Sequence, residues 1–268
     1  MELKKTRILS PRRTLISFLI ICLCWSAFEI YRSINAYHNV DVLDTEIKEE
    51  VITENKNEED PHKKALSRII SFESLKKRNK DVIGWIYVPG TDIDEVVMQG
   101  DENMTYLRHG IDGNYLVAGQ IFNDVRNHAF DDQYAILYGH NMSNGTRFAG
   151  VRRVFLNGKN SWDKFKKIYI YTPDKKIHVY IVFSANKIHS TDKLYDTQMI
   201  FDNSEQSQSN ISEKLSYIKQ TSVYWRDIDQ KKIQENNKKI VMLSTCAGAN
   251  TEWRNCIFGF ESEIYDMG

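Results

Sequence analysis

An uncharged apolar run near the N-terminus is the first feature of the hydrophobic pattern. It extends from Leu15 to Phe28, between Arg13 and Glu29. Crossing a bilayer takes about 20 mostly apolar residues, with roughly 17 as a minimum. The run needs its flanking residues to reach that length, so we predict a transmembrane anchor over residues 14–31. A cleaved signal peptide is the alternative, but no small-x-small cleavage site follows the run.

The next segment, residues 32–64, is polar and rich in Glu, Lys and Asn. Within it, apolar residues recur at helical spacing between Val40 and Val51. The pattern predicts a partly helical stalk that holds a domain over residues 65–268 away from the membrane. A further helix is expected over residues 61–79.

Beyond residue 80 the pattern changes to short apolar runs bounded by turn residues. Pro173-Asp174 separates two of these runs and predicts a hairpin. Helices are expected over residues 204–220, from the spacing of apolar residues, and over 103–109. Many short strands and few helices predict a mainly β fold, a closed or nearly closed barrel with added helices. The expected strands are residues 82–88, 95–99, 120–122, 134–138, 167–172, 176–184 and 239–244.

The charge is unevenly distributed along the chain, although the formal net charge is zero. Residues 1–13 contain five basic residues and one acidic residue, which gives +4. The rest contains 31 basic and 35 acidic residues, so it has no basic surplus for binding nucleic acid. Basic residues before an apolar run predict a cytoplasmic N-terminus. We therefore expect a single-pass protein of the cell membrane, with residues 1–13 cytoplasmic and the domain extracellular.

Two of the four cysteines, Cys246 and Cys256, lie outside the apolar run. A secreted domain stapled by disulfides would carry more cysteines, although one bridge between these two remains open from the sequence. Cys246 follows a strand-like run and precedes a turn of small residues. A sheet would therefore hold the thiol while a loop leaves it accessible.

A nucleophilic thiol needs a cation or a base nearby. Arg254 would return beside Cys246 if the chain turns at residues 247–251 and continues as a strand. Its guanidinium could then stabilise an oxyanion. An inert buried thiol near a surface arginine is the alternative.

His140 lies at a second predicted strand end, beside the polar loop 141–145. Its ordinary pKa near 6.5 suits proton transfer at neutral pH, whereas a loop histidine without a role is the alternative. His109 and His128 are weaker candidates. The spacing of cysteines and histidines does not fit a zinc site, and no nucleotide-binding glycine pattern occurs. We therefore expect no metal and no cofactor.

Several segments resemble motifs of the sortases, cysteine transpeptidases of Gram-positive bacteria, and most of all class B sortases. Leu243-Ser244-Thr245-Cys246 resembles the T-L-x-T-C signature, with Met242 where Thr is usual. Tyr138-Gly139-His140-Asn141-Met142 resembles the segment around the sortase histidine. Asp81–Ile86, Val88–Thr91 and Gly119–Asp124 resemble stretches typical of class B. The resemblance covers roughly residues 65–262, with the motifs in the family's order behind an N-terminal anchor.

The resemblance implies a closed eight-stranded sortase barrel, with N-terminal helices and a helical insertion before the last strands. It implies that Cys246 attacks a carbonyl within a C-terminal sorting signal of a secreted protein. His140 would protonate the departing amine, and Arg254 would stabilise the oxyanion. An amine, typically of a peptidoglycan precursor or cross-bridge, would resolve the thioacyl enzyme. Ser244 and Thr245 are expected to shape the substrate groove or donate hydrogen bonds.

Two other functions remain open from the sequence. A membrane-anchored cysteine peptidase would use the same three residues but release its product to water. A non-catalytic surface-binding module on a sortase-like barrel would have no need of the three residues together.

Overall fold

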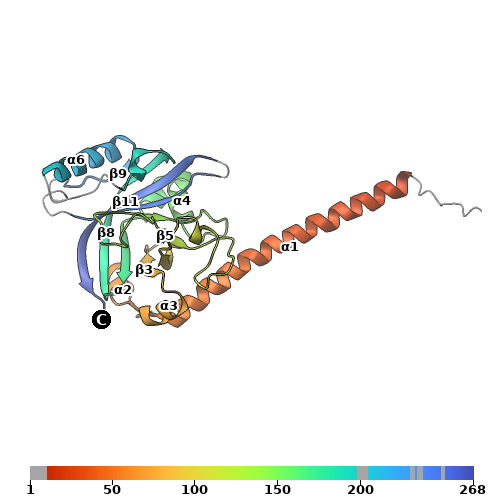
Figure 1. Ribbon diagram of the computed structural model, residues 1–268, viewed down its shortest axis with the longest axis horizontal. Coiled ribbons are helices and arrows are strands. Elements are labelled where there is room, and N and C mark those ends of the chain that lie inside the picture. Colours follow the sequence, from red (N-terminus) through yellow and green to blue (C-terminus); the bar gives the residue numbers. More distant parts are fainter. Residues whose placement is uncertain (1–10, 198–204, 230–232, 234–237, 249–250) are drawn as a thin grey trace, which may run out of the picture.

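A long N-terminal helix and a β-barrel surrounded by helices are the two main parts of the protein (Figure 1). The computed structural model describes residues 11–197, 205–229, 233, 238–248 and 251–268. Most of the expected cytoplasmic segment, residues 1–10, lies outside the described residues. Residues 249–250 of the expected turn after Cys246 also lie outside them.

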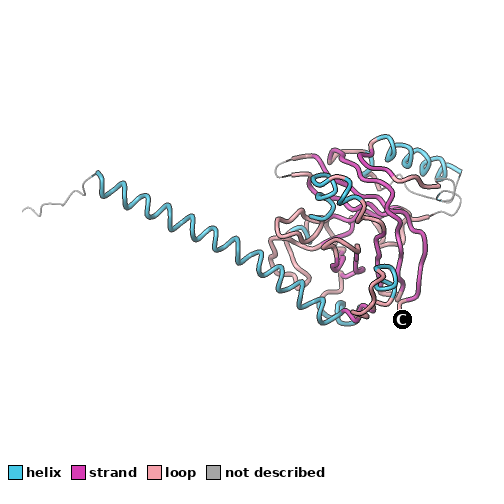
Figure 2. The backbone as a smooth tube through the Cα atoms, turned by 180° about the vertical axis from the view of Figure 1, so that it is seen from behind, coloured by secondary structure: helices cyan, strands magenta, loops and turns pink. Residues whose placement is uncertain are grey.

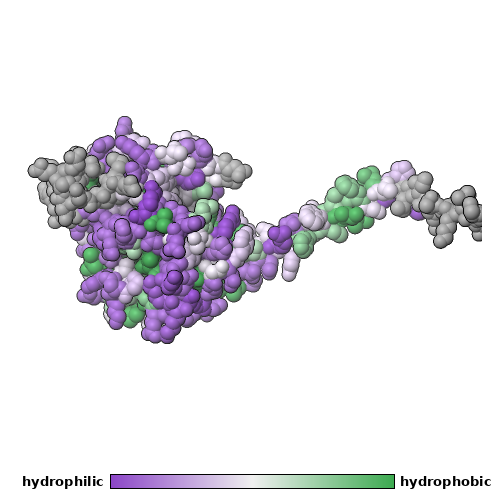
Figure 3. Space-filling view, in the orientation of Figure 1, coloured by the Kyte–Doolittle hydropathy of each residue, from purple (hydrophilic) through white to green (hydrophobic). Residues whose placement is uncertain are grey.

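The N-terminal helix, α1, extends from Pro11 to Val51. Apolar side chains are exposed along its first half, and by length and composition this half could cross a membrane. Figure 3 shows these side chains as a green band on the part of the helix that projects from the domain. This finding is consistent with the expected single-pass anchor.

The second half of α1 packs against the barrel domain. Val40, Ile47 and Val51 are buried, in two apolar clusters that the helix shares with the domain. The sequence predicts that helix and stalk are separate elements, whereas the structure continues one helix to Val51. Apolar residues at helical spacing keep one face of α1 on the domain. This part of the polar segment is therefore a packed element of the fold.

The single helix expected over residues 61–79 is wrong, because a short strand divides it. Ile70 in this strand pairs with Ile52 of another two-residue strand, and the Ser71 hydroxyl caps a new helix. The first helix therefore ends at Leu66, because the next residues pair as a strand and Ser71 then caps a second helix. The elements are β1 (Ile52–Thr53), α2 (Pro61–Leu66), β2 (Ile69–Ile70) and α3 (Phe72–Arg78).

The barrel strands are β3 (Val82–Tyr87), β4 (Asp94–Met98), β5 (Ile121–Asn123), β6 (Tyr134–Tyr138), β7 (Lys167–Thr172), β8 (Lys176–His189), β10 (Ile240–Cys246) and β11 (Trp253–Asp266). Their order is β11-β10-β6-β5-β4-β3-β7-β8, and pairing of β8 with β11 closes the ring. A further strand, β9 (Ser222–Trp225), pairs with β8 outside the ring. These pairings confirm the predicted closed eight-stranded barrel. The hairpin predicted at Pro173-Asp174 is confirmed as β7–β8.

The helical insertion expected before the last strands is confirmed as α6 (Glu205–Gln220). Its buried residues, among them Leu215, pack on β6, β10 and β11, and Figure 2 shows the helix outside the strands. The short helix expected over residues 103–109 is present as the 3-10 turn η1 (Thr105–Leu107). Three further elements were not predicted from the sequence: α4 (Ala149–Asn157), α5 (Lys159–Trp162) and the 3-10 turn η2 (Lys193–Tyr195).

Side chains of β10 alternate between two apolar clusters, as the period of two along a strand requires. Val241 and Leu243 lie in the interior cluster of the barrel, whereas Met242 lies in the outer cluster beneath α6. By the same alternation Ser244 and Cys246 belong to the outer face. The strand therefore places Cys246 on the outer face of the barrel, at the C-terminal end of β10.

Candidate active site

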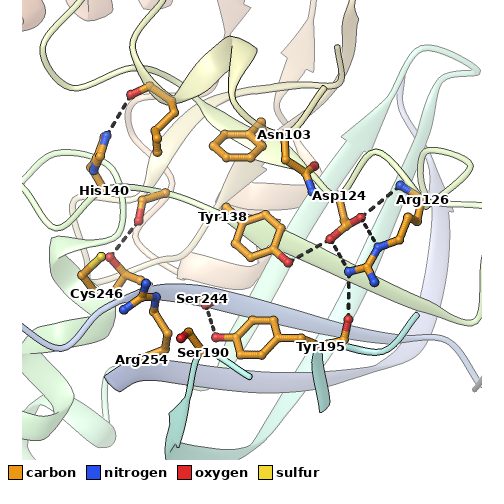
Figure 4. Close-up of a pocket in the computed structure, with 14 residues that line it drawn as sticks. Asn103, Asp124, Arg126, Tyr138, His140, Ser190, Tyr195, Ser244, Cys246 and Arg254 are labelled. Atoms are coloured by element: carbon orange, nitrogen blue, oxygen red, sulfur yellow. Dashed lines mark hydrogen bonds and ion pairs between the residues drawn. The ribbon is translucent and has the colours of Figure 1, made fainter. Parts of the chain in front are cut away.

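Strand register brings His140, Cys246 and Arg254 to one end of the barrel. β6 and β10 run parallel with Tyr138 opposite Ser244, so His140 and Cys246 each lie two residues beyond a paired position. β10 and β11 run antiparallel, and Cys246 pairs directly with Arg254. The expected return of the chain beside Cys246 is thus confirmed. Figure 4 shows the three side chains around one cavity.

The His140 ring is fixed by the carbonyl oxygen of Leu107, which lies 2.8 Å from Nε2. A carbonyl only accepts, so Nε2 carries the proton and Nδ1 is left as the acceptor of the neutral ring. Burial lowers the pKa of His140, the nearby charges of Arg108 and Arg147 lower it further, and the bond to Leu107 opposes them. The ring is therefore neutral at neutral pH, with Nδ1 ready to take a proton.

Cys246 is half-buried and borders the same cavity as His140. No hydrogen bond joins these two described residues. Such contacts are often long before substrate binds and tighten in the complex. The arrangement can therefore serve proton transfer once a substrate closes the site.

The Arg254 guanidinium is oriented by backbone at the start of its own strand. Nη1 donates to the carbonyl oxygens of Thr251, at 2.7 Å, and Trp253, at 3.1 Å. A guanidinium has five N–H donors in one plane, so two such bonds fix it without using all of them. Arg254 can therefore donate to an oxygen that develops charge beside Cys246.

Ser244 and Thr245 border the cavity, but their hydroxyls have partners within the protein. Thr245 Oγ1 donates to the carbonyl oxygen of Gly139 at 2.7 Å. Ser244 Oγ lies 2.7 Å from the hydroxyl of Tyr195. These bonds join the strand end of Cys246 to the backbone beside His140 and to η2. The expectation that Ser244 and Thr245 shape the substrate groove stays a prediction.

An ion pair between the buried Asp124 and the partly exposed Arg126, which the sequence pattern did not predict, forms another wall of the cavity. Asp124 accepts hydrogen bonds from Nε and Nη2 of Arg126 and from the hydroxyl of Tyr138, each at 2.8 Å. Burial raises the pKa of Asp124, but the bonds from Arg126 and Tyr138 bring it below the ordinary value. Asp124 is therefore ionised at neutral pH, and its hydrogen bonds fix the side chains of Arg126 and Tyr138.

Tyr195 connects this wall to the strand that carries the thiol. Its ring stacks on Tyr138, with centroids 6.2 Å apart, and its carbonyl oxygen accepts from Arg126 Nη2 at 2.8 Å. Its hydroxyl is the partner of Ser244 described above. The cavity has a volume of about 580 Å³, within the usual range for ligand sites. Its lining includes Asn103, Leu107, Phe122, Tyr138, Ser190 and Tyr195.

Cys256 is more deeply buried than Cys246. It is fully buried opposite Ser244, and burial raises the pKa of its thiol to about 12. Both cysteines are free thiols in the structure, so the bridge left open by the sequence does not form there. His109 and His128, the weaker histidine candidates, do not line the cavity. Cys246 and His140, by contrast, both line it.

A protein-family model described as the Sortase domain matches residues 86–259, well over half of the chain. The chain belongs to the sortase family. This sortase is similar to two curated proteins named Sortase B. It is 33% identical to that of Staphylococcus aureus over 182 residues, which cover 68% of this chain and 69% of the relative. It is 29% identical to that of Listeria monocytogenes over 180 residues, which cover 65% and 66%.

A solved structure, a Staphylococcus aureus sortase B–substrate complex, resembles this sortase with a TM-score of 0.61 at 29% identity. The likeness covers 74% of this chain and 85% of that one. The resemblance to class B sortases inferred from the sequence is therefore confirmed by the names of these relatives.

Proposed function

We propose that this sortase is a class B-type cysteine transpeptidase, which cleaves a C-terminal sorting signal of secreted proteins and transfers them to a cell-wall amine. The observation that carries the proposal is the meeting of Cys246, His140 and Arg254 at the ends of three neighbouring strands. A cavity of about 580 Å³ beside them can take a short peptide segment. The related Staphylococcus aureus sortase B was solved as a complex with a substrate, which supports substrate binding by this fold.

In the proposed reaction, Cys246 Sγ attacks a backbone carbonyl carbon of the sorting signal while His140 Nδ1 takes the thiol proton. Nδ1 is the nitrogen that the Leu107 contact leaves unused. The tetrahedral intermediate collapses when His140 returns the proton to the departing amine, which breaks the peptide bond and leaves a thioester on Cys246. An incoming amine then attacks the thioester and restores the thiol. Nucleophile, proton carrier and oxyanion donor are what acyl transfer requires.

Arg254 is the proposed oxyanion donor. Its cross-strand position opposite Cys246 places a permanent positive charge beside the carbonyl under attack. Removing one such preorganised donor typically slows a reaction about 100- to 1,000-fold.

We further propose that residues 14–31 anchor the enzyme in the cell membrane, with residues 1–13 in the cytoplasm and the catalytic domain outside. The exposed apolar half of α1 and the N-terminal basic residues support this arrangement. Substrate proteins that carry a sorting signal and a peptidoglycan amine are the proposed partners.

Product analysis of peptide cleavage, with and without an amine acceptor, tests the proposed function. We expect cleavage of a sorting-signal peptide that depends on Cys246, followed by an adduct with the acceptor amine. Hydrolysis without any adduct would favour the cysteine peptidase instead. The binding module predicts neither cleavage nor selective labelling of Cys246 by a thiol-reactive probe. Cys246→Ala is the control in every assay.

A further inference from the structure

The second half of α1 lies against two loops, and each of them holds one side of His140. The first loop follows Leu107, whose carbonyl fixes the imidazole, and ends at Gly119. The second loop, residues 141–147, follows His140 in the chain. Figure 1 shows these loops, in yellow-green, running along α1 where the helix meets the barrel.

Apolar contacts seat the helix on both loops at once. Val40 of α1 is fully buried in a cluster with Leu116 and Ala118 of the first loop and Met142 of the second. Leu43, on the next turn of the helix, packs against the same cluster. The two loops therefore share one apolar support, which α1 provides.

Polar contacts fix the second loop more closely. Asp41 accepts a hydrogen bond from Asn144 Nδ2 at 2.8 Å, at the solvent-exposed tip of the loop. Asp44 accepts one from Arg147 Nη1 at 2.8 Å, at the buried base of the loop. Both acids lie on the face of α1 that meets the domain. The helix thus contacts the loop both at its tip and at its base.

Arg147 transmits this support to the histidine. It is fully buried, binds Glu95 of β4 and donates from Nε to the carbonyl oxygen of Gly119 at 2.8 Å. The next residue, Phe148, donates its N–H to the carbonyl oxygen of His140 at 2.8 Å. Arg147 has a φ of 57°, a conformation that non-glycine residues rarely adopt unless their contacts hold it. The base of the loop, with His140 in it, therefore depends on the partners of Arg147.

We infer that Asp41 and Asp44 are positioning residues for His140. In this inference α1 supports the geometry of the active site in addition to anchoring the enzyme. This inference rests on the proposed function and adds a role for α1 in it. Reacting groups must lie about 3–3.5 Å apart, and a displacement of about 1 Å can cost about 100-fold in rate. Loss of a contact at the loop base should therefore reduce the rate of the chemical step.

The test uses the full-length chain in detergent micelles and measures kcat and KM for a sorting-signal peptide. Asp41→Ala removes the contact to Asn144, whereas Asp41→Asn keeps an oxygen that can accept it. Asp44→Ala removes the contact to Arg147. Glu49→Gln, which also removes one carboxylate from an exposed position of α1, is the matched control. Thermal unfolding of each variant shows whether the barrel is intact.

We expect kcat to fall about threefold to tenfold in Asp41→Ala, the range that loss of one hydrogen bond allows, and about tenfold or more in Asp44→Ala. KM should stay within about twofold, because the walls of the peptide cavity are unchanged. Asp41→Asn and Glu49→Gln should turn over as wild type does. In a double-mutant cycle, adding Asn144→Ala to Asp41→Ala should cause little further loss, because both remove the same contact.

Hydrogen exchange over residues 139–148, followed by mass spectrometry, gives a readout that needs no activity. Exchange in this segment should rise in both alanine variants and stay at the wild-type level in Glu49→Gln. A wild-type enzyme that cleaves no peptide would contradict the proposed function, and the exchange data would still decide whether α1 holds the loop. Unchanged exchange, or unchanged kcat in an active enzyme, would overturn the inference. If Asp44→Ala fails to fold, the comparison of Asp41→Ala with Asp41→Asn, at an exposed position, decides whether the inference holds.

Discussion

Replacing Asp124 by asparagine should destabilise the barrel domain while leaving its shape almost unchanged. Asp124 is fully buried and accepts bonds from Arg126 and from the hydroxyl of Tyr138. In Asp124→Asn, an amide N–H₂ group replaces one acceptor oxygen and faces these donors. The substitution therefore removes a charge and leaves at least one buried donor without an acceptor.

The size of the effect follows from the bonds that are lost. A hydrogen bond to a charged group contributes about 1.5–3 kcal/mol. The Arg126 side chain is 42% exposed, so screening by solvent reduces its share. We expect the free energy of unfolding to fall by about 2–4 kcal/mol at neutral pH. Urea unfolding followed by tryptophan fluorescence measures it. Asp131→Asn, at an exposed neighbouring position, should change it by less than about 0.5 kcal/mol.

The difference between wild type and Asp124→Asn should also depend on pH. The folded-state pKa of Asp124 is below its ordinary value, and an unfolded Asp has a pKa of about 3.9. A depressed pKa adds stability that is fully present above the unfolded pKa and is lost as the pH falls through the folded pKa. The difference should therefore be constant at neutral pH and narrow below about pH 4. An equal difference at pH 3 and pH 7, or none at pH 7, would refute the reasoning.

Three further predictions test other parts of the structure. Arg254→Lys should lower kcat for peptide cleavage at least tenfold, because an ammonium cannot reproduce the planar donor set; near wild-type turnover would contradict the oxyanion role. Leu215→Ala should lower the free energy of unfolding by about 2–5 kcal/mol in a denaturant titration, because Leu215 is fully buried between α6 and the barrel. A loss below about 1 kcal/mol would mean that α6 contributes little to stability. Iodoacetamide should label Cys246 and leave Cys256 unlabelled in the folded protein, as peptide mass spectrometry can show. Labelling of Cys256 at a similar rate would contradict its burial and its pKa of about 12.

Cys246 and His140 could be proposed as catalytic candidates from the sequence because each lies at the end of a recognisable strand. Cys246 and Arg254 are separated by one turn, so local pairing alone places them together. The Asp124–Arg126 pair has a weaker local signal: Asp124 ends a stretch that resembles class B sortases, and Arg126 lies beyond that stretch. Its partners Tyr138 and Tyr195 come from other elements, and period-two alternation does not predict which strands become neighbours. Such long-range contacts require the barrel topology.

The sequence predicts a returning strand that carries Arg254, but it does not predict the full extent of β11. Its alternation is interrupted at Gly259 and again between Glu261 and Glu263, and the structure has register irregularities at these two places in the pairing with β8. A bulge shifts the period of two by one residue, so the alternation does not reveal the full length of the strand. The helix α4 was missed for a different reason, since it is short and contains Gly150, a weak helix former.

The continuation of α1 into the domain was missed because its sequence is polar overall. The apolar positions around Val40 and Ile47 predict a helix, but they do not predict which part of the protein its buried face contacts. The partner consists of loops and short strands brought together by the barrel. Packing against these elements, and not helix propensity, makes this half of α1 part of the fold.

Direct detection of a thioacyl intermediate on Cys246 tests the central claim most directly. The full-length enzyme is mixed with a sorting-signal peptide, quenched in acid within seconds and analysed by intact and peptide-level mass spectrometry. We predict a mass increase equal to the acyl fragment, located on Cys246, absent from Cys246→Ala and discharged by an added amine to give the amine adduct. Turnover in Cys246→Ala, or an acyl group located on Cys256, would contradict the account.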